Sequence, residues 1–296
     1  MHSAVRLTCV TLSLLASALA QAANDRPQFD LAFSALGDDA SGRSFDINAM
    51  LSPGARWSIA AGAGSSDAGG ATGAAVPSLH GTSFNGSVDL KLGQFGLKPG
   101  FSHWRDDDHF SSSTPQLSAY WKHGGLRTQL QLERPKFALD YQLRIATQTI
   151  TRLFEFSGNG IGGGLDWYGN HWSSSVSFMS YSYGNEVTRV RAILNTPNLQ
   201  DFPRLTLLAS SMATLTRGAL KDRTAAGLEY AFTRTSVHAD LTSVTDAISD
   251  ARSASYGLGV AYVLNSRVSV DLSGGISHAD GLDDTKYASV ALNLHW

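Results

Sequence analysis

The sequence has very little cysteine and no excess of positive charge, and both shortages exclude whole classes of function. Its 296 residues contain a single cysteine, and 23 lysines and arginines stand against 25 aspartates and glutamates. A protein that binds nucleic acid through its phosphates needs a basic surface, so nucleic acid is not an expected partner. One thiol allows neither an internal disulfide nor a zinc site built from several cysteines.

Long apolar runs and helical periodicity are also missing after the first 22 residues. No later stretch reaches the about 20 apolar residues that a membrane-spanning helix needs. Glycine is plentiful instead, with 29 glycines against 8 prolines. Together with frequent serine and threonine, this composition favours an all-β chain with many tight turns.

The first 22 residues have the three parts of a secretory signal peptide. Arg6 supplies a short positive region, residues 7–19 form an apolar stretch, and the small residues at 18–22 offer cleavage sites. The apolar stretch is too short to span a bilayer. Cys9 lies inside it, where a lipoprotein cysteine would not be. We therefore expect residues 23–296 to be exported as one cysteine-free domain.

Alternation of apolar and polar residues recurs along the remaining chain. Residues 29–35, 45–51, 126–133, 137–145 and 237–241 all follow a period of two. Runs of about 8 to 11 residues have the length that a tilted strand needs to cross a bilayer. In a soluble sandwich the apolar face would point inward, whereas in a membrane barrel it points to lipid.

Turn lengths and aromatic positions favour the membrane barrel. Short connections, such as Gly93-Gln94 and 123–125, tend to alternate with longer polar ones, such as 65–80 and 105–114. Periplasmic turns and extracellular loops alternate in this way. Tryptophans and tyrosines gather at strand ends, as in an interfacial girdle. Counting back from a periplasmic C-terminus, we expect roughly 16 to 18 strands, an even number being usual.

That count depends on two segments. Residues 184–204 form either one long extracellular loop or a loop that contains a strand at 186–194. With the strand, every short turn falls on the periplasmic side. Residues 132–136 (LERPK) then become an unusually short outer turn.

The last ten residues, Tyr287 to Trp296, are the most specific segment of the sequence. They read YASVALNLHW, so that Val290, Leu292, Leu294 and Trp296 share one face of a strand. This segment resembles the C-terminal recognition signal of Gram-negative outer-membrane β-barrel proteins, and the rest of the chain resembles them in pattern. The resemblance implies a transmembrane antiparallel β-barrel in the cell outer membrane. It also implies two kinds of partner: outer-membrane lipid with lipopolysaccharide, and the barrel assembly machinery that reads the signal.

The face opposite the apolar one carries charges of both signs, while the last strands, between residues 255 and 291, contribute mostly small residues to it. A barrel of this strand number is too wide for side chains to fill. Mixed charge and free volume favour a porin-like passive channel for small solutes, without a cofactor. The alternative is a lumen packed by ion pairs. The expected lumen-lining residues are Asp46, Asp89, Lys91, Lys98, Arg127, Glu133, Asp140, Arg144, Glu229, His238, Asp240 and Asp271.

Catalytic and metal-binding candidates are weaker signals. His171 and Ser173 have the i, i+2 spacing that puts a base and a nucleophile on one face of a strand, as in a few outer-membrane lipid hydrolases. However, the expected topology places His171 in a periplasmic turn, and no orienting acid is identifiable. Asp106, Asp107 and Asp108 could hold Ca²⁺, although a solvated acidic loop is the simpler interpretation.

Two alternatives to a channel therefore stay open. One is an outer-membrane enzyme that acts on lipid or polysaccharide, and the other is a structural or export-associated barrel with a filled lumen. The enzyme would need a polar cluster assembled at one rim of the barrel.

Overall fold

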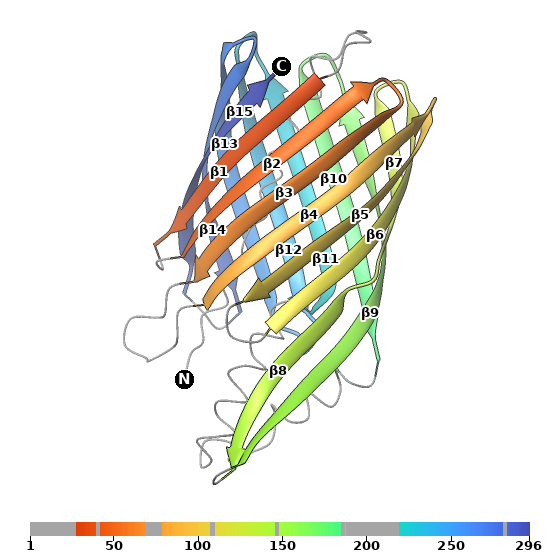
Figure 1. Ribbon diagram of the computed structural model, residues 1–296. Helices are drawn as coiled ribbons and strands as arrows, with labels where there is room; N and C mark the ends of the chain where they lie inside the picture. The colour runs from red at the N-terminus through yellow and green to blue at the C-terminus, as the bar shows by residue number, and fades with distance from the viewer. Residues whose placement is uncertain are drawn as a thin grey trace.

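The described residues of the chain form one antiparallel sheet that closes into a barrel (Figure 1). The computed structural model describes residues 28–39, 42–68, 79–106, 110–145, 148–184, 187, 219–280 and 283–296. The expected signal peptide lies outside these ranges. The strands are β1 (Gln28–Asp38), β2 (Arg43–Gly54), β3 (Trp57–Ala68), β4 (Leu79–Leu92), β5 (Phe95–Asp106), β6 (Phe110–His123), β7 (Leu126–Glu133), β8 (Lys136–Ile145), β9 (Gln148–Tyr168), β10 (Trp172–Tyr183), β11 (Leu220–Ala231), β12 (Thr235–Asp246), β13 (Arg252–Asn265), β14 (Val268–Ala279) and β15 (Thr285–His295).

β7 and β8 are two halves of one strand position. Both pair with β6 in an unbroken register, because Glu133 lies opposite Gln116 and Lys136 lies opposite Ser113. The 21-residue β9 likewise pairs first with β8 and then with β7. Pro135 interrupts the ladder because proline has no N–H to donate. The barrel therefore has 14 strands around its circumference.

The expected all-β antiparallel barrel is confirmed, with 14 strands rather than the roughly 16 to 18 counted from the sequence. The outer turn expected at residues 132–136 is not a turn, since the chain continues straight through it. The hairpin turns instead between Ile145 and Gln148, which are paired. The strand considered at residues 186–194 lies outside the described residues except for Val187.

Strand length matches a bilayer. Many strands have 12 residues, and 12 residues at about 3.3 Å each extend about 40 Å. When tilted, such a strand crosses a hydrocarbon core of about 30 Å. β8 and the paired part of β9 project beyond the other strands at the bottom of Figure 1. Among the described residues, no helix is both long and apolar enough to cross a membrane.

The two ends of the barrel differ in the length of their connections. Tight turns, including those at Gly93 and Gly124, lie at the end where β15 finishes and β1 begins. Both glycines have positive φ values, 66° and 58°, that other residues rarely adopt. Longer connections, such as 69–78, join the strands at the opposite end. Short turns mark the periplasmic side of outer-membrane barrels, so we call the opposite end the outer end.

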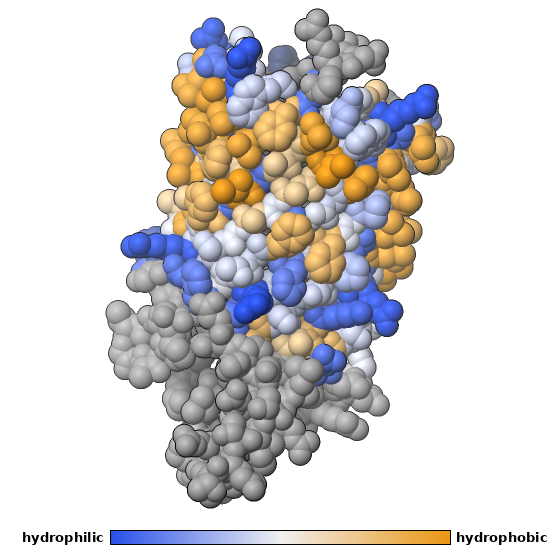
Figure 2. All heavy atoms as spheres, viewed as in Figure 1, coloured by the Kyte–Doolittle hydropathy of each residue, from blue (hydrophilic) through white to orange (hydrophobic). Residues whose placement is uncertain are grey.

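Large apolar side chains are exposed on the outside of strands all round the barrel and form a belt, of which Figure 2 shows one face. Leu130 is 52% exposed, Phe84 51% and Leu272 59%. An apolar band this continuous would be unfavourable in water and is typical of a surface in contact with lipid. Because side chains alternate along a strand, the residues between them, such as Gln131 and Asp271, point into the lumen.

The barrel closes where β1 pairs with β15. Their register runs from Asp30 opposite His295 to Asp38 opposite Tyr287. Trp296 extends this ladder by one residue. Its N–H donates to the Phe29 carbonyl oxygen at 2.9 Å, its carbonyl accepts from the Phe29 N–H at 3.1 Å, and the two rings lie 5.5 Å apart. The residue expected to be read during assembly thus also completes the closing seam.

We expect Trp296→Ala to lower the free energy of unfolding by about 1 to 2 kcal/mol, because the ring contact with Phe29 is lost. Deleting Trp296 removes the two backbone bonds as well, and should reduce the folded, heat-modifiable fraction without affecting export. Urea unfolding of refolded protein and gel migration measure the two effects. An unchanged folded fraction in the deletion variant would contradict this description of the seam.

We expect Leu130→Arg and Leu272→Arg each to cost about 2 to 4 kcal/mol of folding stability in lipid vesicles, because both place a charge in hydrocarbon. Gln131→Arg is the matched control on the lumen face, beside the Glu133 carboxylate. Its cost should be much smaller. Equal costs at Leu130 and Gln131 would show that the two faces are assigned the wrong way round.

Candidate functional site in the barrel lumen

Glycines let interior side chains reach across a whole strand. A Cβ atom added at Gly96 would overlap the ring of Tyr120, and one added at Gly160 would lie 2.6 Å from the ring of Tyr181. Tyr120, on β6, therefore lies flat over β5. Its hydroxyl donates to Asp89 Oδ1 on β4 at 2.8 Å. Contacts between second-neighbour strands of this kind build the polar interior.

Four cations line the inner side of β4 to β7. Lys122 lies opposite Arg127, and Lys91 lies opposite Gly96 beneath Tyr120. Arg127 Cζ is 4.2 Å and Lys122 Nζ is 5.4 Å from the centre of the Tyr120 ring, so both contact its π face. We call Lys91, Lys98, Lys122 and Arg127 the basic wall.

Two carboxylates accompany the basic wall. Arg127 Nε lies 3.8 Å from Asp166 Oδ2 and has no hydrogen-bond partner although it is buried. Asp89 accepts the hydrogen bond of Tyr120 and lies level with Lys98. Within the described part of the chain, four cations thus share two carboxylates, and the basic wall keeps a positive charge.

A second polar group lies on β11, β12 and β14. His238 Nδ1 is 3.6 Å from Asp271 Oδ2, and His238 Nε2 is 3.9 Å from Asp240 Oδ2. The imidazole reaches Asp271 across β13 because Gly259 has no side chain. A Cβ atom at Gly259 would collide with the His238 ring. Glu229 lies opposite His238 in the β11–β12 pair. We call Glu229, Asp240 and Asp271 the acidic wall, with His238 between them.

Glu133 belongs to neither wall and is held by three neighbours. Tyr181 donates its hydroxyl to Glu133 Oε2 at 2.6 Å, Gln131 donates to Oε1 at 2.6 Å, and Arg223 donates to Oε1 at 3.3 Å. The Glu133 side chain is 8% exposed. A carboxylate so fully hydrogen-bonded stabilises the barrel across β7, β10 and β11 rather than presenting charge to a solute.

Several interior charges stay accessible to water. The Asp240 side chain is 47% exposed, the Arg223 side chain is 38% exposed, and Lys122 is exposed too. Side chains packed into a filled interior would be buried. At these positions the lumen is wide enough to admit water.

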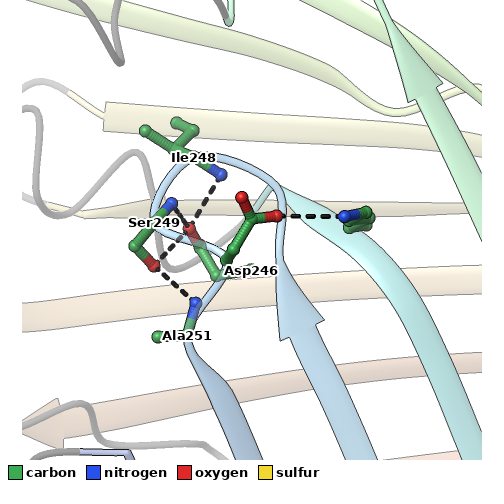
Figure 3. Close-up of polar contacts among 6 residues, drawn as sticks. Asp246, Ile248, Ser249 and Ala251 are labelled. Atoms are coloured by element: carbon green, nitrogen blue, oxygen red, sulfur yellow. Dashed lines mark hydrogen bonds and ion pairs between the residues drawn. The ribbon is translucent and has the colours of Figure 1, made fainter.

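The outer end carries a buried apolar cluster on its inner side. Phe137 stacks on Phe156 with ring centres 4.7 Å apart, and Ile248 reaches the same cluster from the β12–β13 turn. Figure 3 shows that turn, in which Asp246 Oδ1 accepts the N–H groups of Ile248 and Ser249 at 2.8 and 2.6 Å. The buried members of this outer cluster are Phe110, Phe137, Phe156, Val187, Ala219 and Ile248.

The structure separates the lumen residues expected from the sequence into groups. Asp89, Lys91, Lys98 and Arg127 meet at the basic wall, and Glu229, His238, Asp240 and Asp271 meet at the acidic wall. Asp46, on β2, lies away from both, over Gly64 of β3. Asp140 and Arg144 belong to the projecting part of β8, where side chains are outside the described set.

Sequence reasoning missed several interior residues: Tyr120, Lys122, Asp166, Tyr181 and Arg223. They contact residues on other strands, up to 90 positions away in the case of Arg223 and Glu133. For the two tyrosines, the available signal was a glycine in the paired position of the next strand. Such pairs are recognisable only when the register is known.

The catalytic and metal candidates have separate partners. Ser173 donates to Glu229 Oε2 at 3.3 Å, whereas His171 Nδ1 lies 3.2 Å from the Ala231 carbonyl oxygen. Asp106 accepts the Phe110 N–H at 2.7 Å, and Asp107 and Asp108 lie outside the described residues. In the described ranges, no group of three or more His, Cys, Asp or Glu side chains could hold a metal ion.

We expect Gly96→Ala to lower folding stability by about 1 to 3 kcal/mol, because the new methyl displaces Tyr120 and breaks its bond to Asp89. Gly86→Ala, on the outward face of the adjacent β4, is the matched control, since its Cβ would meet nothing closer than 3.8 Å. Urea unfolding in vesicles compares the two. Equal stability of both variants would show that the Tyr120 packing is unimportant.

Comparison with known proteins identifies the fold. No family model and no curated protein matches the chain. Outer-membrane expressed OmpT of Vibrio cholerae aligns with a TM-score of 0.51 and 9% identity over 93% of this chain and 99% of that one. The KdgM porin gives 0.42 and 8% over 90% and 98%, and OccK3 (OpdO) of Pseudomonas aeruginosa gives 0.39 and 10% over 91% and 95%. At 9% identity the likeness to Vibrio cholerae OmpT shows the fold alone, which is that of outer-membrane β-barrels.

Proposed function

We propose that this barrel is a passive channel for small polar and charged solutes across the outer membrane. The observation that supports the proposal best is a lumen whose charged side chains stay accessible to water, as Asp240 and Arg223 do. A barrel of 14 strands is also too wide for its own side chains to fill. Passage through such a lumen needs no cofactor.

The placement of the two walls makes the charge distribution across the lumen asymmetric. β6, in the basic wall, and β13, in the middle of the acidic wall, are six strand positions apart in one direction round the barrel and eight in the other, so the two walls lie on roughly opposite sides. Fixed charges of opposite sign on opposite walls set up a field across the lumen. A solute with both a positive and a negative group would be oriented by that field. An apolar solute would make no favourable electrostatic contact with either wall.

We also propose how the protein reaches its membrane. Residues 1–22 would direct export, and the C-terminal strand, with Tyr287, Val290, Leu292, Leu294 and Trp296, would be read by the barrel assembly machinery. The ladder from Trp296 to Phe29 supports this, because the strand that is read would then complete the seam.

A barrel with a closed lumen that supports partners is the second candidate. Two observations favour it: the hydrogen-bonded Glu133 group, and the outer cluster, which packs apolar rings on the inner side of the outer end. In that case the wall charges would hold the barrel together rather than select solutes.

Conductance in planar bilayers separates these functions. We expect refolded wild type to give ohmic steps. A Lys91→Gln, Lys98→Gln, Lys122→Gln variant should shift selectivity toward cations, and a Glu229→Gln, Asp240→Asn, Asp271→Asn variant should shift it toward anions, because each leaves one wall dominant. The reversal potential in a salt gradient measures the shift. Lys286→Gln is the control, since Lys286 is exposed on the outer face of β15.

A silent wild type would count against the channel. If the wall variants also unfolded at lower temperature, the charges would act as structural partners, since removing one member of a pair leaves the other uncompensated. That combination would favour the barrel with a closed lumen.

A further inference from the structure

The outer surface of the barrel carries cations at the level where its apolar belt ends. Along β7 and β8 the outward-facing residues are Leu130 and Leu132, followed by Arg134 and Lys136. Both leucines are exposed to lipid, at 52% and 44%, and both cations are exposed as well. The change from apolar to cationic occurs within two residues, toward the outer end.

The neighbouring strands change at the same level. On β5, exposed Phe101 is followed on the same face by His103 and Arg105. His103 lies opposite Ser113 of β6, which lies opposite Lys136. The Arg134 N–H donates to the Pro115 carbonyl oxygen at 3.0 Å, which places Arg134 one step closer to the belt. We call His103, Arg105, Arg134 and Lys136 the basic patch.

The basic patch has few anionic neighbours. Across the described residues, no ion pair involves Arg105, Arg134 or Lys136, and Glu155, opposite Ala138 on β9, is the carboxylate nearest in register. His103 Nδ1 bonds to Ser113 Oγ at 2.9 Å. Other outward basic residues at the outer end differ, since Arg43 lies opposite Asp67 and His278 Nδ1 is 2.7 Å from Asp284 Oδ1. Among the described residues, the patch is thus a sector in which positive charge exceeds negative charge.

We propose that the basic patch binds the phosphate groups of a phosphorylated glycolipid in the outer leaflet. Arginine presents several N–H donors in a fork that fits phosphate oxygens, and Lys136 adds a point charge. The acyl chains of the same lipid would lie on Phe101 and Leu132, directly below the patch. This continuity with the lipid-facing belt favours a membrane lipid over a soluble anion. The site faces away from the lumen and is independent of the channel.

The test uses the full mature protein refolded in neutral detergent micelles and titrated with bis-phosphorylated lipid A, with binding followed by native mass spectrometry. We expect the Arg105→Gln, Arg134→Gln, Lys136→Gln variant to bind more weakly by on the order of a hundred-fold, at about five-fold per cation. The matched control is Arg43→Gln, Arg252→Gln, Lys286→Gln, which removes three outward cations from other sectors of the barrel. It should bind like wild type.

Two further probes identify the ligand. Dephosphorylated lipid A should bind the wild type as weakly as the patch variant binds the phosphorylated form. Inorganic phosphate at the same concentration should not displace the lipid, and displacement would show an anion site rather than a lipid site. Equal weakening in the patch and control variants, or no weakening in either, would overturn the proposal. Conductance should be the same in all three proteins, so failure here is distinguishable from failure of the channel.

Discussion

Every feature of this molecule depends on one constraint, which is that a strand in lipid must have all its backbone groups paired. An open sheet of these strands would leave two edges without partners. The ladder between β1 and β15, extended by the two bonds between Phe29 and Trp296, removes both edges. Closure then obliges side chains to alternate between lipid and lumen. The apolar belt and the charged interior are two consequences of the same pairing.

The interior adds a second requirement, because polar groups separated by a whole strand must still meet. Glycine solves this requirement where Tyr120 lies over Gly96 and where His238 lies over Gly259. Because each glycine has no side chain, a larger side chain from the neighbouring strand lies over it and contacts the strand on its far side. The basic and acidic walls are therefore held in place by the residues that have no side chain, as much as by the charged residues themselves.

The sequence predicted the fold because alternation and turn composition are local. It overestimated the number of strands because the Arg134-Pro135 step has the composition of a turn, yet register with β6 is kept through it. Contacts such as Arg223 to Glu133, 90 residues apart, depend on which strands become neighbours around the barrel. Nothing local predicts those contacts. For the same reason the sequence could not group the expected lumen residues, most of which the structure assigns to the basic wall, the acidic wall or the hydrogen-bonded Glu133, while Asp46 lies apart.

The charged residues on the inner and outer surfaces of this part of the barrel have different surroundings. Inside, Arg127 lies 3.8 Å from an Asp166 carboxylate oxygen and over the ring of Tyr120, so that its charge has partners. Outside, Arg134 and Lys136 lie on the next part of the same strand position and have no such partners among the described residues. In hydrocarbon those two cations would raise the free energy of the folded protein. They therefore lie beyond the apolar belt, where phosphates or water surround them. With the outer end assigned from the turn lengths, these cations place the outer edge of the apolar belt, at this strand position, between Leu132 and Arg134.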